Sequence, residues 1–196
     1  MFCNDTLMMN KYILKNSTYI ESENCNERLA NIIVDTIIVH CISLPEKEYD
    51  NNNVIAFFTN KLNYDAHKTF KDLEGLKVSS HLFIRRSGEV IQFVPFDKRA
   101  WHAGKSKYKE RESYNDFSIG IELEGSIDDI YTEMQYQRLK IVIQELKQLY
   151  PSIKDSNILR HSDIAPDRKK DPGAHFSLDK IKSVSYTHLR AHETRI

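Results

Sequence analysis

The chain has 196 residues, which is long enough for one domain with a hydrophobic core. Its 28 Lys and Arg residues balance 28 Asp and Glu residues, so no overall charge favours binding to nucleic acid or to an acidic membrane surface. Three cysteines without a CxxC pair, no signal-peptide pattern and no apolar run long enough to span a bilayer indicate a protein of the cytoplasm.

The first predicted core element is a buried strand over residues 32–39, a β-branched run that ends at His40. A short helix is expected over residues 53–62. Residues 81–95 form two alternating runs on either side of Ser87-Gly88, which is the pattern of a β-hairpin. This part of the chain therefore contributes strands, one of which brings a histidine to its end.

The next strand, FSIGIELEG, has the most regular pattern in the chain. Apolar residues alternate with polar ones, so one face enters the core and the other carries Glu122 and Glu124. Gly120 lies between the polar positions, and we expect it to leave room for a ligand on that face.

A long amphipathic helix follows that strand. Thr132 and Gln135 form a capping-box pattern at its start, and Pro151 ends it. The segment NILR then forms a last strand that leads into His161. Helices mixed with hairpin-joined strands predict an α/β domain of the α+β type, with a central mixed β-sheet flanked by helices.

Residues 160–176, RHSDIAPDRKKDPGAHF, gather charged and metal-binding side chains where proline and glycine disfavour a helix. Two strand-end histidines and a nearby aspartate suit a catalytic zinc site, which takes three protein ligands and leaves one position for water. From the residues alone, the candidates are His40, His161 and one of Asp163, Asp167 or Asp171. The alternative is that the histidines are ordinary polar residues and the loop is solvated surface.

Four longer motifs resemble one family in the same order. IIVHCISLP, KVSSHLFIRRSGEVIQFVPFDKRAWHAG, NDFSIGIELEG and HSDIAPDRKKDPG are similar to the AmpD-type N-acetylmuramoyl-L-alanine amidases, which share the fold of peptidoglycan recognition proteins. The similarity covers residues 32–176 and implies a single zinc amidase domain over residues 1–182. It also implies one zinc ion per chain, held by His40, His161 and Asp171.

The resemblance implies hydrolysis of the amide between (1,6-anhydro-)N-acetylmuramic acid and L-alanine of muropeptides, in bacterial cell-wall recycling, by a cytoplasmic monomer. Glu122 matches the family's general base, and Lys169 matches a cation that stabilises charge on the carbonyl oxygen. The simpler alternatives are a structural salt bridge of Glu122 with Arg86 or Lys98, and a solvated loop position for Lys169. Glu124 is the better candidate for a structural carboxylate.

The resemblance also implies a groove for the muropeptide, and we expect it to include Trp101, His102, Ala100, Lys77 and Cys41. Cys41 stands where the family usually carries asparagine, and Lys77 where an arginine often reads the peptide carboxylates, so peptide preference is expected to differ.

Two other functions are compatible with the same fold. A peptidoglycan-binding module of the same fold would not cleave, and it would usually have lost a zinc ligand. A phage-type lytic amidase needs no signal peptide, so this function stays open as well.

Residues 183–196 resemble nothing expected of this fold, so we expect a sequencing artefact there and assign no function to His188 and His192.

Overall fold

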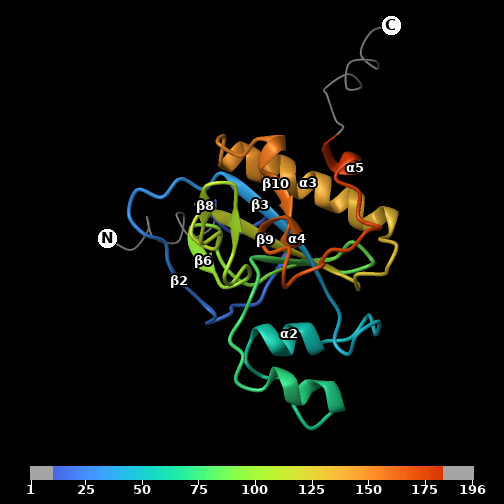
Figure 1. Ribbon diagram of the computed structural model, residues 1–196. Coiled ribbons are helices and arrows are strands. Elements are labelled where there is room, and N and C mark those ends of the chain that lie inside the picture. Colours follow the sequence, from blue (N-terminus) through green and yellow to red (C-terminus); the bar gives the residue numbers. More distant parts are fainter. Residues whose placement is uncertain (1–10, 183–196) are drawn as a thin grey trace, which may run out of the picture.

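A six-stranded mixed sheet forms the centre of the fold (Figure 1). The computed structural model describes residues 11–182. The strands are β1 Thr18–Tyr19, β2 Cys25–Glu27, β3 Thr36–Ile42, β4 Leu82–Ile84, β5 Val90–Gln92, β6 Lys98–Ala100, β7 Lys107–Tyr108, β8 Arg111–Glu112, β9 Ser118–Glu124 and β10 Ile158–Arg160. The helices are α2 Asn53–Phe58, α3 Glu133–Leu149, α4 His161–Ile164 and α5 Asp179–Lys182, with 3-10 turns η1 Lys68–Leu73 and η2 Asp155–Asn157.

The order of strands in the sheet is β1-β5-β4-β9-β3-β10. β4 and β5 pair antiparallel as the predicted hairpin, whereas the other neighbours pair parallel, so the predicted mixed sheet is confirmed. β3 and β9 lie side by side at the centre, in a register that sets His40 directly opposite Glu122. Paired residues in neighbouring strands direct their side chains to the same face, so these two share one side of the sheet.

Helices cover the two faces of the sheet from opposite sides (Figure 1). On one face, α3 packs its apolar side against the alternate residues of the central strands that include Val39, Leu82 and Ile121. On the other face, α2 contributes Phe57 to a second apolar cluster, and Ile164 of α4 belongs to a third. His40 and Glu122 lie on this second face, where two separate clusters replace one continuous core.

The capping box predicted for the long helix is present. The Thr132 hydroxyl accepts from the Gln135 backbone N–H at 3.1 Å, and the Gln135 side-chain oxygen accepts from the Thr132 N–H at 3.0 Å. Such reciprocal bonds satisfy donors that a helix start otherwise leaves unpaired. Within residues 11–182, the helices lack the combined length and apolar character needed to cross a bilayer.

Three predicted boundaries are wrong. β3 starts at Thr36 and runs two residues past His40, because its partner β9 begins at Ser118, opposite Thr36, and continues beyond Glu122. α2 ends at Phe58, short of the expected residue 62. Asn60 there adopts a left-handed backbone with φ of 59°, which an α-helix cannot continue through.

The loop that begins at Arg160 was expected to contain no helix, yet it opens with the single turn α4. Proline restricts the residue before it, and Ala165, which precedes Pro166, leaves the helical region with φ of −148° and ψ of 54°. Pro166 therefore ends the helix after a single turn, and His161 lies on that turn.

Candidate active site

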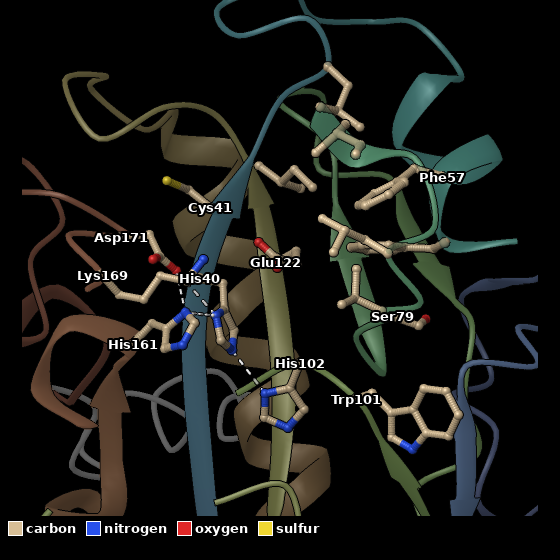
Figure 2. A pocket seen from close by; sticks show the side chains of 16 residues that line it. His40, Cys41, Phe57, Ser79, Trp101, His102, Glu122, His161, Lys169 and Asp171 are labelled. Atoms are coloured by element: carbon tan, nitrogen blue, oxygen red, sulfur yellow. Dashed lines mark hydrogen bonds and ion pairs between the residues drawn. The ribbon is translucent and has the colours of Figure 1, made fainter. Parts of the chain in front are cut away.

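Three side chains from distant parts of the chain meet on the second face of the sheet (Figure 2). His40 Nδ1 lies 2.9 Å from His161 Nδ1 and 3.2 Å from Asp171 Oδ2. His161 Nδ1 lies 3.0 Å from the same Asp171 oxygen. Asp163, which spacing alone left open, instead pairs with Arg160 at 2.9 Å. The structure therefore brings together the three residues that the resemblance implied as ligands.

The geometry and chemistry of these donors fit a divalent metal ion. Nitrogen ligands at 2.0–2.1 Å from a tetrahedral zinc ion lie about 3.3 Å apart. The three observed separations are 2.9, 3.0 and 3.2 Å, which are close to this value. Two imidazoles and one carboxylate form a ligand set found in catalytic zinc sites, which keep a further position for water or substrate.

The surroundings hold His40 and Asp171 in the protonation states that bind metals. Burial, with His161 alongside, lowers the pKa of His40 to about 4, so its ring is neutral near pH 7. Burial opposes ionisation of Asp171, but its close interactions with the adjacent His161 and His40 rings outweigh burial and hold the pKa of that carboxyl below its usual range. A neutral imidazole and an ionised carboxylate have lone pairs free for a metal.

Glu122 adds a carboxyl group beside the triad. Its side chain is buried, and Oε2 has no hydrogen-bond partner. Burial, and then the nearby Asp171 carboxylate, raise the pKa of Glu122 well above its ordinary value. An unpaired buried carboxyl group is costly in a purely structural role, and it is typical of a group that exchanges protons during a reaction.

The salt-bridge alternative for Glu122 is wrong. Lys98 pairs with Glu27 at 3.3 Å, and the Arg86 guanidinium donates to a backbone carbonyl at Ile130, at 3.1 Å. Glu124, two positions further along β9, is the structural carboxylate, because it accepts backbone N–H groups of Asp50 and Arg86 at 2.9 Å each.

Lys169 also reaches the site. It lies on the exposed loop between α4 and Asp171, and its backbone N–H donates to the Ala165 carbonyl at 2.9 Å. Its side chain lines the same cavity as His40 and Glu122 (Figure 2). A lysine in this place brings a positive charge to the mouth of an otherwise anionic site.

The cavity has a volume of about 330 Å³ and joins this polar centre to an apolar wall. The wall comes from the loop after β3, from α2 and from the segment around η1, with the residues Leu44, Phe57, Phe58, Leu73, Leu76 and Val78. No sequence motif indicates this wall. Its members belong to separate short segments without a shared period, so only the fold assembles them.

The residues expected in the groove take different places. Cys41 and Trp101 line the cavity, and the Trp101 indole N–H donates to Asn26 Oδ1 at 2.6 Å. Burial raises the pKa of the Cys41 thiol to about 12, so the group is a neutral thiol near pH 7. Ala100 is fully buried in the cluster under α2, whereas Lys77 is exposed between two residues of the apolar wall.

His102 lines the cavity and also fills the space over Gly120. A Cβ atom on Gly120 would lie 2.4 Å from the His102 ring, so a larger residue cannot occupy that position. The expected room for a ligand above Gly120 is therefore wrong, because an imidazole takes it. His102 Nδ1 lies 3.0 Å from His40 Nε2, so this ring contacts the triad directly (Figure 2).

Gly173 holds the chain that carries Asp171. Its φ is +90°, and a Cβ atom there would lie 1.9 Å from the Ile127 carbonyl oxygen. We expect Gly173→Ala to lower the free energy of unfolding by about 2–4 kcal/mol, because it adds a clash to a strained backbone. Gly75→Ala is the matched control, since φ there is +80° with no atom within 4 Å, and it should cost about 1 kcal/mol. Urea unfolding of both variants measures this, and equal losses would show that the Ile127 contact is unimportant.

A triad that could hold a metal ion, a buried carboxyl group and a cation around one cavity form an arrangement typical of metal-dependent hydrolases. The family model described as N-acetylmuramoyl-L-alanine amidase matches residues 30–174. The chain therefore belongs to the N-acetylmuramoyl-L-alanine amidase family.

Relatives and solved structures agree with this assignment. The chain is 52% identical over 146 residues to the 1,6-anhydro-N-acetylmuramyl-L-alanine amidase AmpD of Escherichia coli K12, covering 74% of this chain and 79% of that protein. The protein of the same name from Salmonella typhimurium SL1344 is 50% identical over 148 residues, with 76% and 79% covered. The crystal structure of a Se-Met AmpD derivative superimposes with a TM-score of 0.85 at 43% identity, covering 88% of this chain and 96% of that one.

A more distant structure contains a bound ligand. AMPDH3 from Pseudomonas aeruginosa, solved in complex with an anhydromuramic pentapeptide, is 25% identical with a TM-score of 0.55. The match covers 83% of this chain and 64% of that one.

Proposed function

We propose that this chain is a zinc-dependent amidase. It hydrolyses the amide bond between 1,6-anhydro-N-acetylmuramic acid and L-alanine in muropeptides, a step of bacterial cell-wall recycling. The observation that carries the proposal is the register of β3 and β9, which sets the unpaired Glu122 carboxyl beside His40 and its two partner ligands. The names of the relatives at about half identity support the choice of substrate.

The reaction needs a nucleophile, a proton carrier and stabilisation of a developing negative charge. Zinc held by His40, His161 and Asp171 would supply an activated water and would polarise the scissile carbonyl. Glu122 takes the proton from the attacking water and then delivers it to the nitrogen of the leaving L-alanine. Because Oε2 of Glu122 has no other partner, it is free to accept and release this proton.

Lys169 places its ammonium group at the cavity, where it stabilises negative charge on the carbonyl oxygen. We expect Lys169→Met to lower kcat by about 10²–10³-fold with zinc still bound, since one preorganised charge is lost. Steady-state cleavage of anhydromuropeptide measures the effect. Lys170→Met is the control, because it removes the neighbouring exposed lysine, which does not line this cavity. Equal activity of the two variants would assign Lys169 to solvated surface.

The substrate class sets the remaining parts of the proposal. We propose further that the enzyme acts on a soluble muropeptide as a cytoplasmic monomer, with one zinc ion per chain and with residues 1–182 as its domain. The tail from residue 183 lies outside the described residues. Cys41 and Trp101 are proposed to contact the substrate in the cavity, with Lys77 at its rim and Ala100 behind it.

Two other functions are less well supported. A binding module that does not cleave would have no use for a buried unpaired carboxyl group next to a complete ligand set. A lytic amidase would attack the assembled wall. The purified protein should therefore release free L-alanyl peptide from soluble anhydromuropeptide and leave intact sacculi largely undissolved. Rapid solubilisation of sacculi would favour the lytic function, and cleavage of neither substrate would favour the binding module.

A further inference from the structure

The turn formed by residues 102 and 103 contacts both histidine ligands on the side away from the metal position. Each ligand directs Nδ1 into the triad, so its Nε2 atom faces outward. The outward nitrogen of His40 lies 3.0 Å from His102 Nδ1. That of His161 lies 3.2 Å from the Ala103 carbonyl oxygen. Two consecutive residues thus supply the outer partners of two ligands that are far apart in sequence.

In each contact, the position of the imidazole proton follows from a neighbouring group that can only accept a hydrogen bond. The Ala103 carbonyl can only accept, so His161 carries its proton on Nε2 and keeps Nδ1 free for a metal. The other ligand, His40, contacts His102, whose proton is placed by Ser118. The Ser118 hydroxyl donates to the Tyr114 carbonyl and therefore accepts from His102 Nε2 at 3.2 Å.

His102 consequently carries its proton on Nε2, and its Nδ1 accepts from His40. This arrangement leaves Nδ1 of His40 free to bind a metal as well. Both ligands are therefore held in the tautomer that a metal site requires.

The turn itself is fixed by a buried side chain. Asn115 Oδ1 accepts the backbone N–H groups of His102 at 3.1 Å and Ala103 at 2.7 Å. Gly120 contributes the space in which the His102 ring lies, since a side chain there would overlap it. Arg168 also donates to the Ala103 carbonyl, and this bond connects the turn to the loop that carries His161 and Asp171.

We infer that this turn, held by Asn115, orients both histidine ligands, and that His102 and Asn115 are positioning residues for the metal site. The inference rests on the proposed zinc-dependent function. His102 acts through His40, so its effect is expected in metal affinity as well as in turnover. Outer partners of metal-binding histidines typically change affinity by about 10–100-fold when removed.

The test is the zinc affinity of purified variants, measured by competition with a chromogenic chelator, together with the visible absorption spectrum of the cobalt-loaded protein. We expect His102→Phe to weaken zinc binding about 10–100-fold and to change the cobalt spectrum, because the ring shape stays while the acceptor is lost. His102→Asn should restore most of the affinity, since its amide oxygen can accept near the position of Nδ1. Gly120→Ala, which keeps His102 but displaces its ring, should weaken binding like His102→Phe.

Asn115→Ala tests the second positioning residue and should weaken zinc binding in the same range. Asn24→Ala is its matched control, because Asn24 is an equally buried asparagine that bonds to the Val78 carbonyl and touches neither ligand. Circular dichroism confirms that each variant is folded. If folded His102→Phe and Gly120→Ala bound zinc with wild-type affinity, the inference would be overturned while the proposed function would stand. No zinc binding by the wild-type protein would instead overturn the proposed function on which it rests.

Discussion

His161→Ala is expected to lose both zinc and amidase activity. The change leaves two ligands where a catalytic zinc site needs three, and without the metal the pKa of the attacking water rises far above neutrality. We therefore expect cleavage of anhydromuropeptide to fall by at least about 10⁴-fold, to the background of the assay. Metal analysis and product detection on the same purified sample measure the two losses together.

The control for this variant is His175→Ala. His175 lies on the same loop, is exposed and lies outside the triad, so its removal should leave zinc content and turnover unchanged. If His161→Ala retained one zinc ion and normal turnover, the ligand set would be wrong. Loss of both properties in His175→Ala as well would point to general disruption of the loop.

Glu122→Gln is expected to separate metal binding from catalysis. Glutamine has nearly the same shape but cannot carry the proton, so kcat should fall by about 10²–10⁴-fold while zinc stays bound. Since Glu122 is buried with an unpaired oxygen, replacing it should not lower the free energy of unfolding. Turnover, zinc content and urea unfolding of one preparation provide the three readouts.

The opposite result is expected for Glu124→Gln. Both Glu124 oxygens accept backbone N–H groups, so the variant should lose about 1–3 kcal/mol of stability and keep most of its turnover. The two carboxylates on one strand thus serve as controls for each other. Near-normal turnover of zinc-loaded Glu122→Gln would refute Glu122 as the general base.

Local patterns predicted the elements that depend on neighbours in the sequence. The alternation in β9, the hairpin at Ser87-Gly88 and the capping box of α3 are properties of short segments, and all three are present. The ends of β3 and α2 were predicted less well. They depend on where a partner strand begins and on the left-handed backbone of Asn60, which apolar periodicity does not report.

In the site, too, local patterns predicted some residues, whereas others depend on the fold. Spacing identified His40 and His161 but left three aspartates open. The family resemblance implied Asp171, and the fold places Asp171 beside the two histidines. The pairing of His40 with Glu122 depends on strand register, which no single segment determines. Contacts such as that of His102 with His40 arise from loop packing over a glycine, so the sequence pattern contained no sign of them.

The most direct test of the zinc amidase is the metal content and anhydromuropeptide cleavage of the purified wild-type chain, before and after chelation. We predict about one zinc ion per chain and release of free L-alanyl peptide, with both lost on chelation and both restored when zinc is returned. Cleavage that persists in metal-free protein, or a folded protein that binds no zinc, would contradict the account.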